Sequence, residues 1–198
     1  LTGFKYIGEQ IAKLEAKGEE SRYIFGFEES YGYLVGTYVR DKDAVVASMM
    51  ICEMAAYYKT HGRALIDVLR DIYAKYGYYL NKTLSFTFAG AKGMVKMAEI
   101  MENLRENAPK SIGGYKTVSI TDYELSVETN LATGEKKSID LPKSDVIAFH
   151  LEGGNSVIIR PSGTEPKVKA YMTAVASDEL KADAIKDKLA ADVNELLK

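Results

Sequence analysis

A short polar loop between two apolar runs is the feature that most constrains how this chain folds. Residues 160–166, with the sequence Arg-Pro-Ser-Gly-Thr-Glu-Pro, follow the β-branched run at residues 155–159. After the loop, Val168, Ala170 and Met172 alternate with Lys169 and Tyr171, which is the period of a half-buried strand. The pattern therefore predicts a loop that is held on a rigid base of two strands.

The same loop concentrates groups that bind anions. Arg160 offers a planar fork of donors suited to phosphate oxygens, and Ser162 and Thr164 add hydroxyls. Gly163 lets backbone N–H groups approach an anion closely. We predict that these residues bind phosphate. The alternative, from the loop alone, is a Pro/Gly turn in which Arg160 forms an ordinary surface salt bridge.

A second polar cluster follows a strand expected at residues 22–27. Glu28, Glu29 and Ser30 suit a polyhydroxylated ligand, because carboxylates accept paired hydrogen bonds from vicinal hydroxyls. A solvated turn is the simpler interpretation of this cluster taken alone. The turn Arg-Asp-Lys-Asp at residues 40–43 comes next, and Asp43 is placed to cap a helix that runs to about residue 59.

In this order, the acidic cluster, the Arg-Asp-Lys-Asp turn and the loop at residues 160–166 resemble the C-terminal half of the α-D-phosphohexomutases. The similarity is greatest to phosphoglucomutases of the kind that also includes phosphopentomutases, and it covers essentially the whole chain. It implies an α/β partial third domain at residues 1–80. An α+β C-terminal domain with a TATA-binding-protein-like fold is implied at residues 81–198.

The resemblance also implies roles for single residues. Glu28 and Ser30 would hydrogen-bond the sugar hydroxyls, and the loop at residues 160–166 would hold the phosphate that is not being transferred. Lys42 would assist as an acid or electrostatic stabiliser near the reacting hydroxyl. The segment with Thr2, Gly3 and Lys5 resembles a loop of the family that helps to select the sugar orientation.

In phosphohexomutases a phosphoserine gives its phosphoryl group to a sugar monophosphate, and the bisphosphate later returns the opposite phosphate. The phosphoserine loop, of Thr-Ala-Ser-His-Asn-Pro type, and the Asp-x-Asp-x-Asp-Arg magnesium loop have no counterpart in this sequence. We therefore expect Mg²⁺ and a sugar bisphosphate primer only in an intact enzyme, whose N-terminal domains would be partners of these residues. The chain alone is expected to be inactive, and its truncated domain could self-associate through an uncovered strand edge.

The resemblance leaves alternatives open for the substrate class and for the activity. Phe27 precedes the acidic cluster, and Tyr31 and Gly32 follow it, unlike the Gly-Glu-Met-Ser-Gly-His segment of bacterial phosphomannomutases, which argues against a mannose preference. Phosphopentomutase or phosphomannomutase specificity is one alternative to glucose phosphates. A stand-alone phosphosugar-binding or protein-interaction module is the alternative from another functional class.

Composition excludes other classes of partner. With 26 basic and 28 acidic side chains, the net charge of -2 gives no electrostatic footprint for nucleic acid or an anionic membrane. The most apolar stretch, residues 44–58, contains Glu53 and is shorter than the roughly 20 residues that a bilayer requires. We interpret it as a buried helix with Cys52 as a packing thiol, and we expect a cytoplasmic protein.

Overall fold

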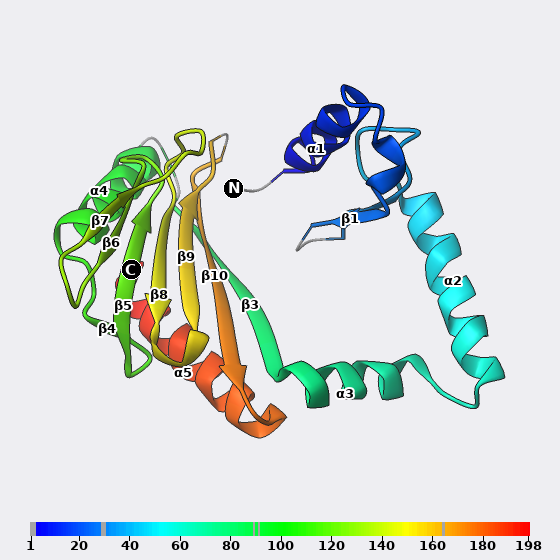
Figure 1. The fold of residues 1–198 in the computed structure, drawn as a ribbon. Helices are drawn as coiled ribbons and strands as arrows, with labels where there is room; N and C mark the ends of the chain where they lie inside the picture. The colour runs from blue at the N-terminus through cyan, green and yellow to red at the C-terminus, as the bar shows by residue number, and fades with distance from the viewer. Residues whose placement is uncertain (1–2, 29–30, 89, 91, 164) are drawn as a thin grey trace. The chain divides into compact units, whose positions relative to one another are not determined.

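The computed structural model describes residues 3–28, 31–88, 90, 92–163 and 165–198. The chain divides into two compact units, residues 1–71 and residues 72–198 (Figure 1).

Unit 1 begins with helix α1 (Lys5–Glu15), followed by a 3-10 turn (Glu20–Arg22) and the antiparallel strands β1 (Phe25–Phe27) and β2 (Tyr33–Val35). Helix α2 (Ala44–Thr60) follows, and helix α3 (Leu65–Tyr76) crosses the division between the units. The strand predicted at residues 22–27 is therefore shorter than expected, because the backbone at Arg22 and Tyr23 closes the 3-10 turn through N–H bonds to Glu19 and Glu20.

A small apolar core joins α1 to the hairpin of unit 1. Phe4, Ile11 and Leu34 are buried, and Ile7 and Tyr23 pack against them. The Tyr23 hydroxyl also donates to the Leu34 carbonyl at 3.2 Å. This contact ties the chain after α1 to strand β2.

Helix α2 differs from its prediction as a buried helix. Asp43 caps it as predicted, with Oδ1 accepting from the backbone N–H groups of Val45 and Val46. However, none of its residues is buried, and Cys52 is exposed. The error has a physical reason: apolar content shows that a helix needs cover, but it does not show which polypeptide supplies that cover.

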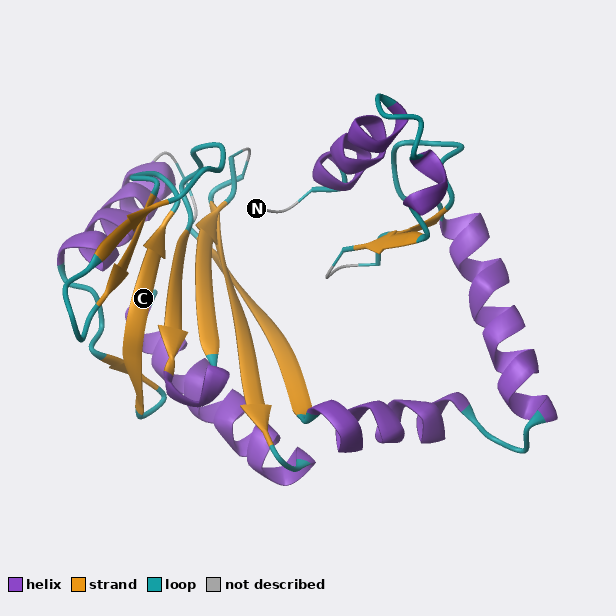
Figure 2. Ribbon diagram, in the orientation of Figure 1, coloured by secondary structure: helices purple, strands orange, loops and turns teal. Residues whose placement is uncertain are grey.

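Unit 2 is an antiparallel sheet covered by two helices (Figure 2). Its strands lie in the order β3-β10-β9-β8-β5-β6-β7, and β4 pairs with β5. The strands are β3 (Tyr78–Thr87), β4 (Ser111–Ile112), β5 (Tyr115–Asp122), β6 (Val127–Asn130), β7 (Lys136–Ser138), β8 (Ile147–Leu151), β9 (Ser156–Pro161) and β10 (Lys167–Ala176). The helices are α4 (Lys92–Glu106) and α5 (Glu179–Leu196).

The core of unit 2 lies between one face of the sheet and both helices. Alternate residues of the central strands point into it, as the pattern after the loop at residues 160–166 predicted. The cluster includes Phe149 and Ile159 from the strands, Met101 from α4 and Leu189 from α5. The loop thus stands at the end of two strands whose inner faces are fully packed.

A tight turn separates strands β5 and β6. The β-branched run from residue 117 to 129 breaks after Asp122, whose Oδ1 accepts from the backbone N–H groups of Glu124 and Leu125 at 2.9 and 3.2 Å. Ser126 completes the turn with φ +54. An aspartate that bonds the backbone two residues later is a turn signal, and it separates β5 from β6.

Candidate functional site

The loop after β9 is shaped by backbone hydrogen bonds that close the β9–β10 hairpin. The Ser162 N–H donates to the Lys167 carbonyl at 2.7 Å, and the Ser162 hydroxyl accepts from the Glu165 N–H at 3.3 Å. Arg160 and Gly163 belong to the same segment, whereas Thr164 lies outside the described residues. The predicted anion-binding side chains are therefore carried by a braced hairpin.

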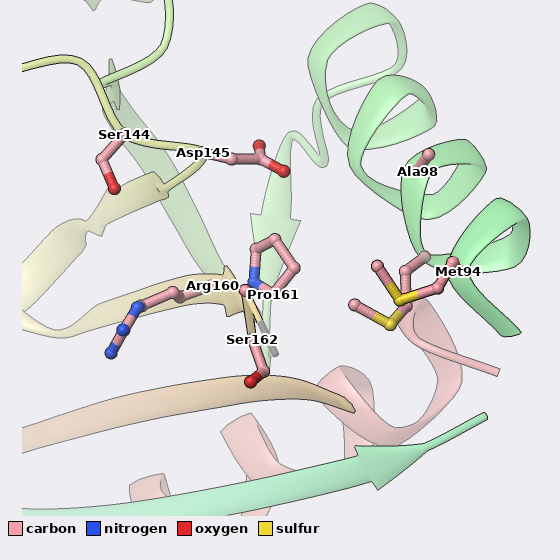
Figure 3. A pocket seen from close by; sticks show the side chains of 9 residues that line it. Met94, Ala98, Ser144, Asp145, Arg160, Pro161 and Ser162 are labelled. Carbon is pink, nitrogen blue, oxygen red and sulfur yellow. The ribbon is translucent and has the colours of Figure 1, made fainter. Parts of the chain in front are cut away.

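Arg160 lies on the sheet face opposite the helices. Its neighbour Ile159 is fully buried in the core, and successive side chains of a strand alternate between the two faces. Figure 3 shows the guanidinium extending away from Met94 and Ala98 of α4. Lys169 is the cross-strand partner of Arg160, so it adds a second cation to the same face. Lys169 was not among the predicted site residues, although the period-two alternation of β10 places it on the exposed face.

Beside this loop lies a pocket of about 380 Å³. The loop forms one wall, α4 supplies an apolar wall, and the segment before β8 supplies a polar one (Figure 3). Its lining residues are Met94, Met97, Ala98, Ser144, Asp145, Arg160, Pro161, Ser162 and Gly163. No local motif marks Ser144 and Asp145, because only the tertiary fold brings them to the loop.

Asp145 is held by a charged network that the sequence did not reveal. The Arg105 guanidinium donates from Nε to Asp122 at 2.9 Å and from Nη2 to Asp145 at 2.5 Å. Burial lowers the pKa of Arg105, but the hydrogen bonds to Asp145 and Asp122 outweigh it, so the pKa is raised overall. The guanidinium stays charged between its two carboxylates.

In unit 1, the β1–β2 hairpin brings Glu28 beside Lys42. The Glu28 N–H donates to the Gly32 carbonyl at 2.8 Å, and the Lys42 Nζ lies 3.5 Å from Glu28 Oε2. A Cβ at Gly32 would lie only 2.6 Å from that carboxylate oxygen, so the glycine makes room for the pair. Ser30, the other predicted sugar ligand, lies outside the described residues.

The charge of Lys42 is fixed by two carboxylates. Asp41, at 3.4 Å from Nζ, and then Glu28 raise the pKa of Lys42 above its ordinary value. The side chain is therefore an ammonium at neutral pH. It can donate a proton or stabilise negative charge, but it is not a base under these conditions.

The turn at residues 36–42 packs on α1. Arg40 forms an ion pair with Glu15, and a Cβ at Gly8 would lie 2.9 Å from the Arg40 carbonyl. In the predicted specificity loop, Gly3 has φ +124 and Lys5 begins α1, with its Nζ 5.1 Å from the centre of the Tyr6 ring. Thr2 lies outside the described residues.

The described residues offer no group of three or more His, Cys, Asp or Glu side chains that could hold a metal ion. These residues therefore do not supply a set of ligands for the magnesium ion that the resemblance implies. Within the described ranges, no helix is long and apolar enough to cross a membrane.

Family models match both units. The model for the phosphoglucomutase/phosphomannomutase α/β/α domain III matches residues 1–76. The model for the phosphoglucomutase/phosphomannomutase C-terminal domain matches residues 95–192.

Curated relatives agree with these matches. The chain is 42% identical over 173 residues to a phosphoglucomutase of Staphylococcus epidermidis, which covers 87% of this chain and 31% of that protein. It is 40% identical over 178 residues to a phosphoglucomutase of Staphylococcus aureus, covering 90% of this chain and 32% of the relative. The chain thus spans about a third of the length of the curated relatives it matches.

Among solved structures, the chain is similar to the open form of the exocytosis-sensitive phosphoprotein pp63/parafusin, a phosphoglucomutase from Paramecium. The TM-score is 0.62 at 16% sequence identity, and the match covers 99% of this chain and 32% of the other. At this identity the likeness establishes the fold alone.

Proposed function

Because the chain belongs to the phosphoglucomutase/phosphomannomutase family as its domains III and IV, we propose that it supplies sugar and phosphate binding to a phosphoglucomutase. The reaction would interconvert glucose 1-phosphate and glucose 6-phosphate through a phosphoserine and a sugar bisphosphate. The observation that carries the proposal is the braced loop with Arg160 opposite Lys169.

In this proposal the loop holds the phosphate that is not being transferred. Arg160 supplies two parallel donors, and Ser162, Gly163 and Thr164 supply hydroxyl and backbone donors. Lys169 adds positive charge beside Arg160. Positioning and charge neutralisation dominate phosphoryl transfer, so these groups act without forming a bond to the substrate.

The hairpin of unit 1 would bind sugar hydroxyls. Glu28 accepts from them, with Ser30 as a second ligand. Lys42, which its raised pKa keeps as an ammonium, acts as an electrostatic stabiliser or as an acid. Thr2, Gly3 and Lys5 would help to select the sugar orientation. The phosphoserine and the magnesium ligands would come from other domains of the enzyme, since the motifs for them are absent from these residues.

A two-dimensional ¹⁵N NMR titration of the 198-residue chain tests the proposal. Inorganic phosphate should shift the amides of Arg160, Ser162 and Gly163 saturably. Glucose 6-phosphate should shift the same amides and also those of Glu28 and Gly32. Glucose without phosphate is the control for the loop. Phosphate-induced shifts that spread evenly over surface lysines, or none at the loop, would overturn the proposal.

A further inference from the structure

The wall of the loop pocket carries a carboxylate, which is unexpected beside a site for phosphate. Asp145 lines the same pocket as Arg160, Ser162 and Gly163, and its side chain is 43% exposed. Although the Arg160 guanidinium extends away from α4, Ser162 and Gly163 line the same pocket as Asp145 (Figure 3). An unpaired carboxylate there opposes the approach of an anion to these two residues and would weaken phosphate binding. Arg105 removes that difficulty by its contact with Asp145 at 2.5 Å.

Arg105 is itself aimed by a buried partner. Asp122 is 9% exposed, accepts from Arg105 Nε at 2.9 Å, and uses its other oxygen for the backbone of the β5–β6 turn. One arm of the guanidinium is therefore anchored to the sheet, and the planar fork directs the other arm at Asp145. The arrangement fixes both the position and the charge of the segment before β8.

We propose that Arg105 is a positioning residue for phosphate binding, which neutralises Asp145 and holds the Ser144–Asp145 wall in place beside the loop. The inference rests on the proposed function of the loop. It assigns to Arg105 an electrostatic role beyond joining α4 to the sheet.

A double-mutant cycle separates the electrostatic role of Arg105 from its structural role in joining α4 to the sheet. The variants are Arg105→Gln, Asp145→Asn and the double variant in the 198-residue chain, and the measurement is the Kd for inorganic phosphate from the shifts of residues 160–163. Arg105→Gln should raise the Kd about tenfold, because Asp145 is left uncompensated. Asp145→Asn should not weaken binding. The double variant should return to within about twofold of Asp145→Asn, since the carboxylate that needs compensation is gone.

The salt dependence of the Kd for phosphate is a second measurement. It should not change if Arg105 has only a structural role. The loss in Arg105→Gln should shrink as NaCl is raised from 20 to about 300 mM, because repulsion between an exposed carboxylate and phosphate is screened. If Arg105→Gln does not fold, Arg105→Gln combined with Asp122→Asn replaces the buried ion pair by two neutral amides and leaves Asp145 bare, and it should show the same loss.

The possible failures are distinguishable. A parental Kd in a folded variant that lacks Arg105, or a double variant as weak as Arg105→Gln alone, would overturn the role of Arg105 only. A parent chain without saturable phosphate shifts at residues 160–163 would overturn the proposed function and, with it, this inference.

Discussion

At the scale of single residues, the candidate site depends on close approaches that larger side chains would prevent. Gly32 is the clearest case, because Glu28 Oε2 and the Lys42 side chain lie where its Cβ would be. The backbone there is not left-handed, so alanine can adopt it. The sequence predicted Glu28 and Lys42 as site residues from a resemblance, but it could not predict the glycine's role, since that role depends on a contact between two segments.

Gly32→Ala should therefore affect the ligand site more than folding. The added methyl group meets the end of a flexible side chain, so Glu28 can turn away from Lys42 at little cost in stability. The loss of one hydrogen bond to a sugar hydroxyl, about 0.5–1.5 kcal/mol, predicts a glucose 6-phosphate response of the β1–β2 hairpin that is about two- to tenfold weaker. NMR titration measures this, with the phosphate response of residues 160–163 as the internal control. An undiminished hairpin response would show that Gly32 does not control the pair.

At the scale of elements, sequence patterns predicted the packed elements better than the uncovered ones. The alternation in β10 and the cap at Asp43 both appear in the structure. The patterns failed where burial depends on polypeptide that local sequence does not specify, as in α2. They also failed where a local turn shortens a strand, as at Arg22 and Tyr23. The structure divides into compact units after Asp71, whereas the domain boundary predicted from the sequence lies near residue 80. That domain boundary stays a prediction.

Because no residue of α2 is buried, we expect its amides to be less protected from hydrogen exchange than those of a packed helix. Unit 1 buries Phe4, Ile11 and Leu34 among its described residues, while α5 is packed in the larger core of unit 2. Amides of α2 should exchange faster than those of α5, a helix of similar length, because few apolar contacts resist local opening. Pairing between copies through exposed surfaces of unit 1 should slow exchange in that unit and leave α5 unchanged. Equally slow exchange in both helices of a sample shown by light scattering to be monomeric would contradict this expectation.

At the scale of the whole molecule, the chain carries two domains of its family, and the curated relatives it matches are about three times as long. We infer that α2 packs against further polypeptide in such an enzyme, because a helix that is apolar on all sides is normally buried. In the proposed function, this chain binds the phosphosugar and other domains carry the phosphoserine. We therefore expect the chain to bind phosphosugars without turning them over.

The 198-residue chain should bind phosphosugars but not isomerise them. With glucose 1-phosphate, Mg²⁺ and glucose 1,6-bisphosphate, a coupled dehydrogenase assay should show no glucose 6-phosphate above background, because the phosphoserine motif is absent from these residues. Protein prepared from a host without its own phosphoglucomutase is the necessary control. Steady turnover by that preparation would show that the chain contains its own phosphoryl carrier.

The most direct test of the central claim is the affinity of the Arg160→Lys variant for glucose 6-phosphate, measured by titration calorimetry on the 198-residue chain. Lysine keeps the charge but cannot reproduce the guanidinium fork, so part of a charge-assisted contact on the order of 1.5–3 kcal/mol is lost. The account predicts a Kd about tenfold weaker with an unchanged Tm. Arg70→Lys, an exposed arginine on α3, is the matched control and should bind like the parent. A parental Kd in Arg160→Lys, with Tm also unchanged, would contradict the account and remove Arg160 from the phosphate site.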